Sequence, residues 1–247
     1  MKNFLKVLYI AAAFVAGSCH AQTLSSAFKT KVNSEYSWPQ ATDAHQTFHF
    51  VSVDGKQYKF YLAISDFFVP IETAAQNSLG VVYVIPKSKT IKLYERKVED
   101  EKEIFNPVAT IETNGTADFV AGIFQSGENF VIRIVDISLE NMPLGSMNIV
   151  NLQPYPIGIK IGNASQVLKM FGHYKKSFNN SKGRLFTEVV NIFDLRNPKS
   201  PKQFYSTQFR FPKDSRSITY LGGLKKTQFE DVDRAQFISV SDRGPRS

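Results

Sequence analysis

The chain has 247 residues, of which 43% are hydrophobic and 13% aromatic, and its net charge is +8. This apolar content excludes a disordered chain, and the length suits one large domain or two small ones. Phe, Tyr, Val and Ile are abundant, which favours strands. A basic surplus of this size suits contact with anionic polymers or membrane surfaces, and it is also common in proteins that bind neither.

The first 21 residues have the pattern of a secretory signal peptide. Lys2 and Lys6 precede an apolar run over 7–16, and small residues lead to Ala21. A basic start, a short apolar stretch and a small-residue exit are typical of a cleaved leader. The run is shorter than the roughly 20 residues of a spanning helix. We therefore expect export to the periplasm, the outer-membrane periphery or the outside of the cell, with no transmembrane helix after processing.

The end of this leader is compatible with two processing routes. Cleavage after Ala21 would release a soluble protein, which is the preferred route. Alternatively, residues 16–19 resemble a bacterial lipobox, although Ala16 stands where Leu is usual, and Cys19 would then be lipidated. Cys19 is the only cysteine, so no intramolecular disulfide can form and the fold must depend on its core.

A linker or arm is expected over 22–44, because this segment is rich in Ser, Thr, Lys and Asn and shows no apolar period. Within it, Trp38 is where the chain should first dock on the folded body.

Two alternating runs, 47–53 and 57–64, then flank Asp54-Gly55. Alternation on both sides of Asp-Gly predicts a β-hairpin, because both central residues of that turn need positive φ.

Short strand-like runs continue to the end of the chain, separated by turn residues. They cover 80–85, 90–96, 108–112, 118–124, 130–137, 147–152, 157–161, 167–174, 185–193, 203–211, 217–221 and 235–240. Strands of this length and spacing predict sandwiches or barrels rather than a parallel α/β sheet. Helix signals are confined to 71–78 and 97–103, and for the second a solvated charged loop is the favoured interpretation.

The strands divide into two sets of about seven each, the number in one immunoglobulin-like sandwich. Pro143 and Gly145 interrupt strand pairing. The predicted fold is therefore all-β, with two immunoglobulin-like antiparallel β-sandwich lobes over 45–142 and 146–243. One large sandwich is the alternative.

Catalytic and metal-binding patterns are weak. His45 and His49 are four apart, which in a strand separates them by roughly 13 Å, too far to share a metal ion. No serine lies in a Gly-x-Ser-x-Gly elbow, and Gly222-Gly223 fits a turn better than a phosphate loop. We expect no catalytic residue, no metal site and no cofactor.

Paired carboxylates for glycan hydrolysis are the enzymatic alternative, because such pairs are spatial rather than sequential. The candidates are Asp118, Glu128 and Asp136. A solvated outer face explains these side chains better.

Basic and aromatic side chains concentrate in the stretch 169–184. The candidate binding residues are Lys169, Phe171, His173, Tyr174, Lys175, Lys176, Lys182 and Arg184. Strand alternation would put Lys169, Phe171 and His173 on one face. Such a platform would suit an anionic polysaccharide, a cell-wall polymer or a lipid surface, whereas nucleic acid is not expected for an exported protein. A solvated hairpin loop is the alternative, and no prediction of oligomeric state follows.

The mid-chain segment 142–163 resembles part of an uncharacterised family of exported β-sandwich proteins common in the Verrucomicrobia–Planctomycetes group. The shared pattern is Gly-Ser, an apolar strand, Asn-Leu, Pro and a second apolar strand ending in Gly. The resemblance implies a paired-strand unit, in which Gly145 permits the turn, Asn151 satisfies backbone groups and Pro156 stops pairing. It implies no catalytic residues. The expected function is that of a non-enzymatic cell-envelope protein with a binding or structural role, and a glycan-directed hydrolase is the alternative.

Overall fold

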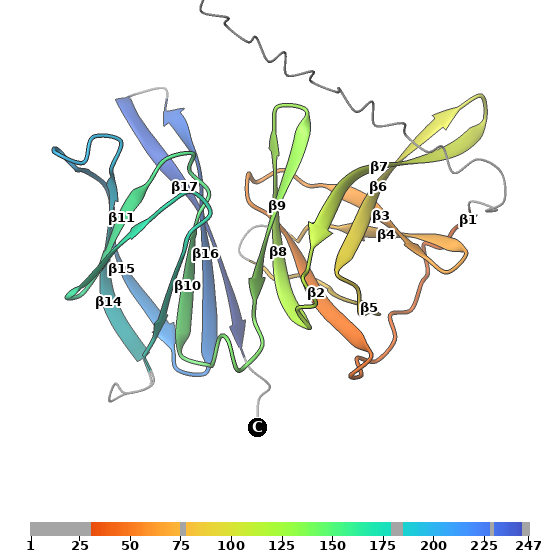
Figure 1. The fold of residues 1–247 in the computed structure, drawn as a ribbon, viewed down its shortest axis with the longest axis horizontal. Helices are drawn as coiled ribbons and strands as arrows, with labels where there is room; N and C mark the ends of the chain where they lie inside the picture. The colour runs from red at the N-terminus through yellow and green to blue at the C-terminus, as the bar shows by residue number, and fades with distance from the viewer. Residues whose placement is uncertain (1–30, 75–77, 179–184, 228–229, 244–247) are drawn as a thin grey trace, which may run out of the picture.

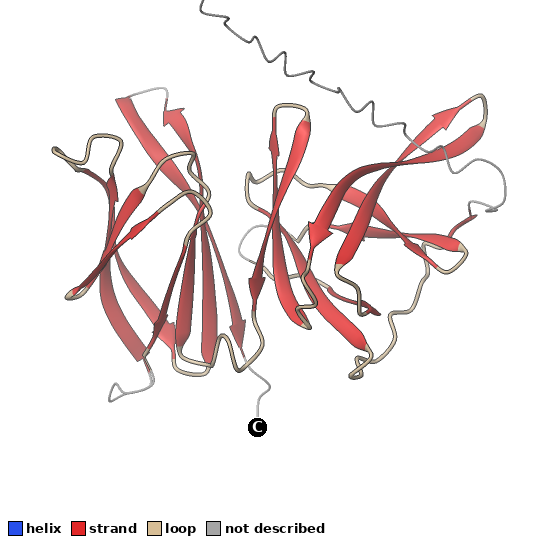
Figure 2. Cartoon of the chain, viewed as in Figure 1, coloured by secondary structure: helices blue, strands red, loops and turns tan. Residues whose placement is uncertain are grey.

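The computed structural model describes residues 31–74, 78–178, 185–227 and 230–243. In these residues the regular elements are all strands, shown as red arrows in Figure 2, so the all-β prediction is confirmed. None of the described residues forms a helix that is long and apolar enough to cross a membrane. The predicted leader, with Cys19, lies outside the described residues.

The described part contains seventeen strands, numbered in chain order. They are β1 (Lys31–Val32), β2 (His45–Ser52), β3 (Lys59–Ile64), β4 (Phe67–Glu72), β5 (Val82–Pro86), β6 (Thr90–Glu99), β7 (Lys102–Glu112), β8 (Asp118–Ser126), β9 (Asn129–Asp136), β10 (Ser146–Asn151), β11 (Ile157–Ile161), β12 (Ala164–Leu168), β13 (His173–Ser177), β14 (Leu185–Asp194), β15 (Lys202–Pro212), β16 (Ser215–Thr227) and β17 (Glu230–Arg243).

Four sheets lie side by side across the molecule (Figure 1). The first lobe contains sheet A, with strand order β1-β4-β3-β6-β7, and sheet B, with order β5-β2-β8-β9. The second lobe contains sheet C, with order β13-β10-β16-β17, and sheet D, with order β12-β11-β14-β15. Sheets B and C are the two inner layers.

Both lobes have the same topology. Matching β2 to β10, β3 to β11 and so on up to β9 and β17 converts the strand orders of the first lobe into those of the second, apart from β1. The match includes the parallel pairs β2–β8 and β10–β16. The lobes therefore repeat one two-sheet unit, joined by the β9–β10 connection. The predicted domain bounds and the immunoglobulin-like description stay predictions.

Hydrophobic side chains fill the three spaces between successive sheets. Phe60 and Phe119 belong to the core between sheets A and B, and Ile159 belongs to the core between sheets C and D. A third cluster, which includes Val120 and Tyr220, takes residues from sheets B and C and so from both lobes. We call the space between sheets B and C the seam.

Tyr220 on β16 ties the two lobes together at the centre of the seam. Its side chain is fully buried, and its hydroxyl donates to the carbonyl of Val120 on β8 at 3.3 Å. A Cβ on Gly122 would lie 2.7 Å from Cζ of Tyr220. Glycine at 122 therefore lets the ring lie directly against the backbone of β8.

The predicted Asp54-Gly55 hairpin is wrong, because β2 and β3 belong to different sheets. Gly55 has a φ of 76°, whereas Asp54 is not in the positive-φ region, so the two-residue hairpin turn does not form. Instead the Asp54 carboxylate accepts hydrogen bonds from Ser52 Oγ at 3.0 Å, Lys56 N at 3.2 Å and the Tyr58 hydroxyl. The chain thereby passes from sheet B to sheet A, and the strands face each other across a core.

Three further expectations differ from the structure. Residues 97–103 form a hairpin end, since β6 reaches Glu99 and β7 begins at Lys102. Gly222-Gly223 lies inside β16, at a break in register between Leu221 and Leu224, rather than in a turn. The arm expected at 22–44 contains β1, which pairs in parallel with β4.

Trp38 docks as expected, edge-on to Tyr83 with ring centres 5.1 Å apart. Of the helix expected at 71–78, residues 75–77 lie outside the described residues, and 71–72 belong to β4.

Candidate functional site

The basic and aromatic stretch is not one strand. β12 ends at Leu168, β13 begins at His173, and residues 169–172 lie between the two strands. Asn151 holds this connection, because its Nδ2 donates to the carbonyls of Leu168 at 3.2 Å and Lys169 at 3.1 Å. Phe171 has a φ of 61°, in the left-handed region that non-glycine residues rarely adopt. The strand alternation expected across Lys169, Phe171 and His173 is therefore wrong.

β13 is the edge strand of sheet C, and its side chains alternate between two environments. Tyr174 is buried in the core between sheets C and D. Lys176 points the same way, with Nζ 3.7 Å from Glu188 Oε1 and 3.4 Å from the carbonyl of Ile161. His173 and Lys175 project from the opposite face, toward the seam.

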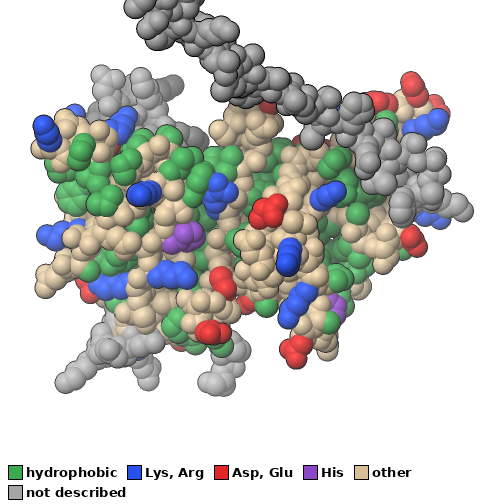
Figure 3. All heavy atoms as spheres, viewed as in Figure 1, with side chains coloured by type: hydrophobic (Ala, Val, Ile, Leu, Met, Phe, Trp, Pro, Cys, Tyr) green, Lys and Arg blue, Asp and Glu red, His purple; other side chains and the backbone are tan. Residues whose placement is uncertain are grey.

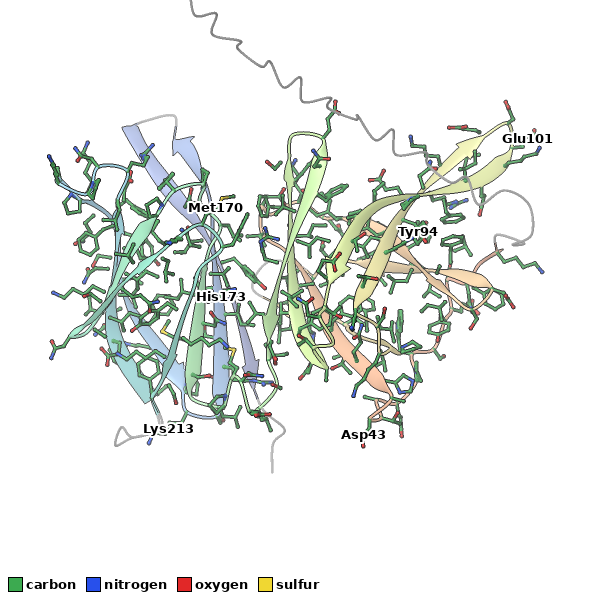
Figure 4. All side chains as sticks on the ribbon, viewed as in Figure 1. Asp43, Tyr94, Glu101, Met170, His173 and Lys213 are labelled. Carbon is green, nitrogen blue, oxygen red and sulfur yellow. The ribbon has the colours of Figure 1, made fainter. Side chains whose placement is uncertain are left out.

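The remaining candidate residues lie at the ends of β13. Lys169 and Met170 are exposed, and Phe171 is half-buried against the seam core. Met170 and His173 are labelled in Figure 4. Lys182 and Arg184 lie outside the described residues. The structure therefore brings together Phe171, His173 and Lys175, with Lys169 beside them.

Arg133 joins these residues from the other lobe. It lies on β9, the edge strand of sheet B, and its guanidinium carbon is 3.6 Å from the centre of the Phe171 ring. Its neighbours Ile132 and Ile134 pack into the core between sheets A and B, so the alternation turns Arg133 toward the seam. Sequence reasoning missed Arg133, because only the facing of two edge strands places it beside Phe171.

Arg133, Phe171, His173 and Lys175 form what we call the seam cluster. The described ion pairs involve other residues, namely Lys59–Glu72, Arg96–Glu103, Lys176–Glu188 and Arg196–Asp194. In addition, Nε of Arg133 is buried and has no hydrogen-bond partner among the described residues. The cluster is thus cationic, and the described part of the chain provides it with no carboxylate.

The charges of the cluster act on one another. Desolvation by the surrounding protein, together with Lys175 and Arg133, lowers the pKa of His173 from its usual value. Burial lowers the pKa of Arg133, although a guanidinium stays protonated at neutral pH. At pH 7 the cluster therefore holds two full positive charges and a mostly neutral imidazole, which an approaching anion would favour in its protonated form.

A hollow of about 240 Å³ adjoins the cluster where the β9–β10 connection meets sheet C. Its lining residues are Asn141, Met142, Pro143, Ser146, Met147, Lys175, Lys176 and Ser177. Lys175 belongs to both the cluster and the hollow, so the two features are continuous.

The carboxylates considered for hydrolysis do not share a site. Asp118 accepts a hydrogen bond from Thr47 at 2.8 Å, and Asp136 accepts one from Asn141 at 2.8 Å. Glu128 lies in the β8–β9 turn, at the other end of that hairpin. Asp118 and Asp136 lie together at the opposite end from Glu128, but Asp136 pairs with Phe119, so alternation puts the Asp118 and Asp136 side chains on opposite faces of sheet B.

The two histidines of β2 have separate partners. His45 shares a hydrogen bond of 2.7 Å with Thr42 Oγ1, and His49 Nδ1 donates to the carbonyl of Leu79 at 3.1 Å. No three His, Cys, Asp or Glu side chains gather as metal ligands in the described residues.

The chain matches no protein-family model and no curated protein. The family resemblance of residues 142–163 stays a prediction, and the function has to be inferred from the seam cluster itself.

Proposed function

We propose that the protein is a non-enzymatic, exported cell-envelope protein that binds an acidic polysaccharide at the seam cluster. The observation that carries this proposal is the group of basic side chains on two facing edge strands, Arg133 on β9 and His173 and Lys175 on β13, without a carboxylate among the described residues.

The setting of the cluster strengthens its attraction for anions. Arg133 is half-buried, and a charge that is partly withdrawn from water interacts more strongly than an exposed one such as that of Lys175. Arg133 is held in place by the Phe171 ring, and Phe171 is held by a hydrogen bond of 2.7 Å from its N–H to the carbonyl of Asn151. A strained, left-handed residue supported in this way is typical of a functional position. The binding groups are therefore oriented before a ligand arrives.

An extended chain fits this arrangement better than a flat membrane. His173 and Lys175 are two residues apart, about 7 Å along the strand. Arg133 faces them across the seam, so the basic side chains follow the course of one edge strand, which suits a polymer with repeated charges. Further Lys and Arg side chains are spread over the same face of the second lobe in Figure 3, where few acidic side chains lie among them.

Binding to polygalacturonate tests this proposal, with dextran as the neutral polymer and anionic vesicles as the lipid surface. We expect polygalacturonate affinity to fall steeply between about 0.01 and 0.15 M salt, as the screening length drops from about 30 to 8 Å. Arg133→Gln and Lys175→Ser should each weaken binding about tenfold or more, because each removes a charge-assisted contact. Lys92→Ser is the control, because it makes the same charge change at an exposed lysine on β6 of the first lobe. It should leave polygalacturonate binding unchanged.

If Lys175→Ser and Lys92→Ser lose the same amount of polygalacturonate affinity, the proposed site is wrong. If dextran binds as tightly as polygalacturonate, the charge argument is wrong. Preference for vesicles over polygalacturonate would assign the cluster to a lipid surface instead.

The export part of the proposal follows from the leader. The intact mass of the protein from its host should lack residues 1–21, or show a lipid on Cys19 if the alternative route is used. A mass that retains Met1 would contradict export.

A further inference from the structure

We infer that the edge of β12 binds a second copy of this chain, and that residues 22–30 of that copy add there as a parallel strand. The edge belongs to sheet D and does not involve the seam cluster, so the inference goes beyond the proposed function. Each copy would supply one strand and receive another, which makes the protein a component of an assembly.

β12 is an edge strand without the usual protection against further pairing. Proteins normally blunt open strand edges with charged side chains, prolines or bulges. Each of the four described sheets has two edge strands, and the other seven of these all contain Lys, Arg, Asp, Glu or Pro. β12 has the sequence Ala-Ser-Gln-Val-Leu and pairs with β11 in an unbroken register. Residues 164–167 are exposed, and Val167 is 60% exposed.

The hairpin geometry fixes which backbone groups of β12 face outward. Two residues, Gly162-Asn163, connect β11 to β12, so the flanking pair Ile161–Ala164 is hydrogen-bonded. Hydrogen-bonded pairs alternate with unbonded ones along an antiparallel ladder. Ser165 and Val167 therefore turn their N–H and C=O groups away from β11. No backbone hydrogen bond from another described residue reaches these outward groups.

The first lobe shows how such an edge is filled. β4 is the counterpart of β12 in the repeat, and it follows β3 after another two-residue turn, Ser65-Asp66. In both hairpins the first turn residue has a positive φ, 50° at Ser65 and 57° at Gly162. β1 adds in parallel to the open side of β4, where Asn33 N donates to the carbonyl of Phe68 at 3.0 Å. Phe68 and Ser165 are each the second residue after the turn, so β12 presents the same kind of edge.

β12 can also pair more completely than β4 does. Pro70 and Val167 are each the fourth residue after the turn. Pro70 has no N–H to donate, whereas Val167 keeps its N–H, so an added strand can both donate to β12 and accept from it. Leu168 is buried in the core between sheets C and D, so alternation places Val167 on the outer face, where it can contact side chains of the added strand.

The N-terminal arm is the segment suited to this edge. The expected removal of residues 1–21, which is the only part of the proposed function used here, leaves nine residues ahead of β1. They include Thr23, Leu24 and Phe28 and contain no proline, so they can pair as a strand. Nine residues extend to about 30 Å, more than the roughly 17 Å that five strand residues need. β1, which follows them directly, already pairs in parallel with β4.

The strand has to come from a second copy. Sheets A and D are the outermost of the four layers (Figure 1). Packed sheets lie about 10 Å apart, so sheet D is about 30 Å from β1. An arm that crossed this distance would have no residues left to pair with β12 of its own copy. Because the arm and the β12 edge are different surfaces, the contact is head-to-tail, and copies join into a ring or an extending chain.

Sedimentation at increasing protein concentration tests the inference, with the chain that begins at Gln22 compared with one that begins at Lys31. We expect the first to form dimers or larger species as its concentration rises. The second keeps β1 and should stay monomeric. Arg133→Gln and Lys175→Ser should leave the association unchanged, because the seam cluster is not involved. Loss of polysaccharide binding and loss of strand addition are therefore separate outcomes.

Val167→Pro removes the outward N–H at the edge. It should weaken the association about tenfold or more, because the added strand loses a hydrogen bond and meets the proline ring. The melting temperature should change little, since β4 has Pro70 at the matching position. Val167→Thr is the matched control. It keeps the N–H and a β-branched side chain, so it should associate as the unchanged chain does.

The inference is overturned if both chains stay monomeric at every concentration, or if the association persists in Val167→Pro. If Val167→Pro lowers the melting temperature, amide hydrogen exchange of the chain that begins at Gln22 decides instead. The N–H of Val167 should exchange more slowly in the associated protein than in the monomer. Equally fast exchange in both would show that the edge stays open. Slow exchange in the monomer would show that the chain's own residues cover the edge, and either result overturns the inference.

Discussion

Asn148 and Asn151 lie on the same strand and have opposite roles. The Nδ2 of Asn151 donates to three carbonyls, those of Tyr155, Leu168 and Lys169, which confirms the expectation that it satisfies backbone groups at the strand end. Asn148 has no such partner among the described residues. The sequence predicts the first role because Asn followed by a Pro-containing turn is a local signal. It cannot predict the second, since burial and partners depend on which strands become neighbours.

Asp54 gives a pH-dependent prediction at the same scale. Burial raises the pKa of Asp54, but the hydrogen bonds from Tyr58, from the backbone N–H groups of Gln125 and Lys56 and from Ser52 outweigh burial and lower it overall. A depressed pKa means that the charged carboxylate stabilises the fold above the unfolded-state pKa of about 3.9, and that this stabilisation is lost as pH falls through the folded pKa.

The measurement compares the free energy of unfolding of the protein and of Asp54→Asn over a range of pH. The difference between them should be constant from pH 7 to pH 5 and should shrink below about pH 4. A difference that stays the same down to pH 2 would show that the charge of Asp54 plays no part.

The positions of the strands were easier to predict than their pairing, which depends on the turns between them. Alternation located most strands, including those over 90–96 and 118–124, because period-two burial is a local property. The partner of each strand depends on the turn that follows it. Asp54-Gly55 has a hairpin sequence without hairpin geometry, whereas Asp100 and Glu101 have the geometry, with φ of 49° and 63°, without the sequence.

The β6–β7 turn therefore offers a stabilising change. Asp100→Asn with Glu101→Gly would place at this turn the residue pair that prefers positive φ, and the chain already uses Asn114-Gly115 at φ of 51° and 87°. We expect a gain of about 1 kcal/mol, mostly from relief of backbone strain at two exposed positions. Urea unfolding measures it. An unchanged or lower midpoint would contradict the hairpin geometry.

The candidate site was predictable only where it is contiguous in the chain. Composition identified Lys169, Phe171, His173 and Lys175, because their chemistry is concentrated in one stretch. Arg133 lies beside them only because two edge strands face each other across the seam, and no local sequence pattern encodes that arrangement.

At the scale of the whole molecule, the seam makes the two repeated lobes interdependent. Apolar residues of both lobes meet there, with Tyr220 against Gly122 at the centre. We therefore expect one cooperative unfolding transition rather than two, since separating the lobes would expose this third core.

Gly122→Ala tests the contact directly. The new methyl group meets the Tyr220 ring, so we expect a loss of about 1–3 kcal/mol. In a Tyr220→Leu background, the same change should cost much less, because the ring is gone and alanine suits a strand better than glycine does. A double-mutant cycle, with the free energy of unfolding measured by chemical denaturation, gives the coupling free energy between positions 122 and 220. Additive effects, or two separate transitions, would contradict a packed seam.

The central claim is that one site, built from both lobes, binds an acidic sugar chain. Amide chemical-shift mapping of the ¹⁵N-labelled protein during titration with polygalacturonate oligomers at low salt tests it most directly. We predict that the largest changes occur at Arg133 on β9 and over residues 171–175, with neighbouring changes at Asn148, while exposed lysines elsewhere, such as Lys92 on β6, are unaffected. Changes spread evenly over exposed lysines of both lobes, or confined to a surface away from the seam, would contradict the account.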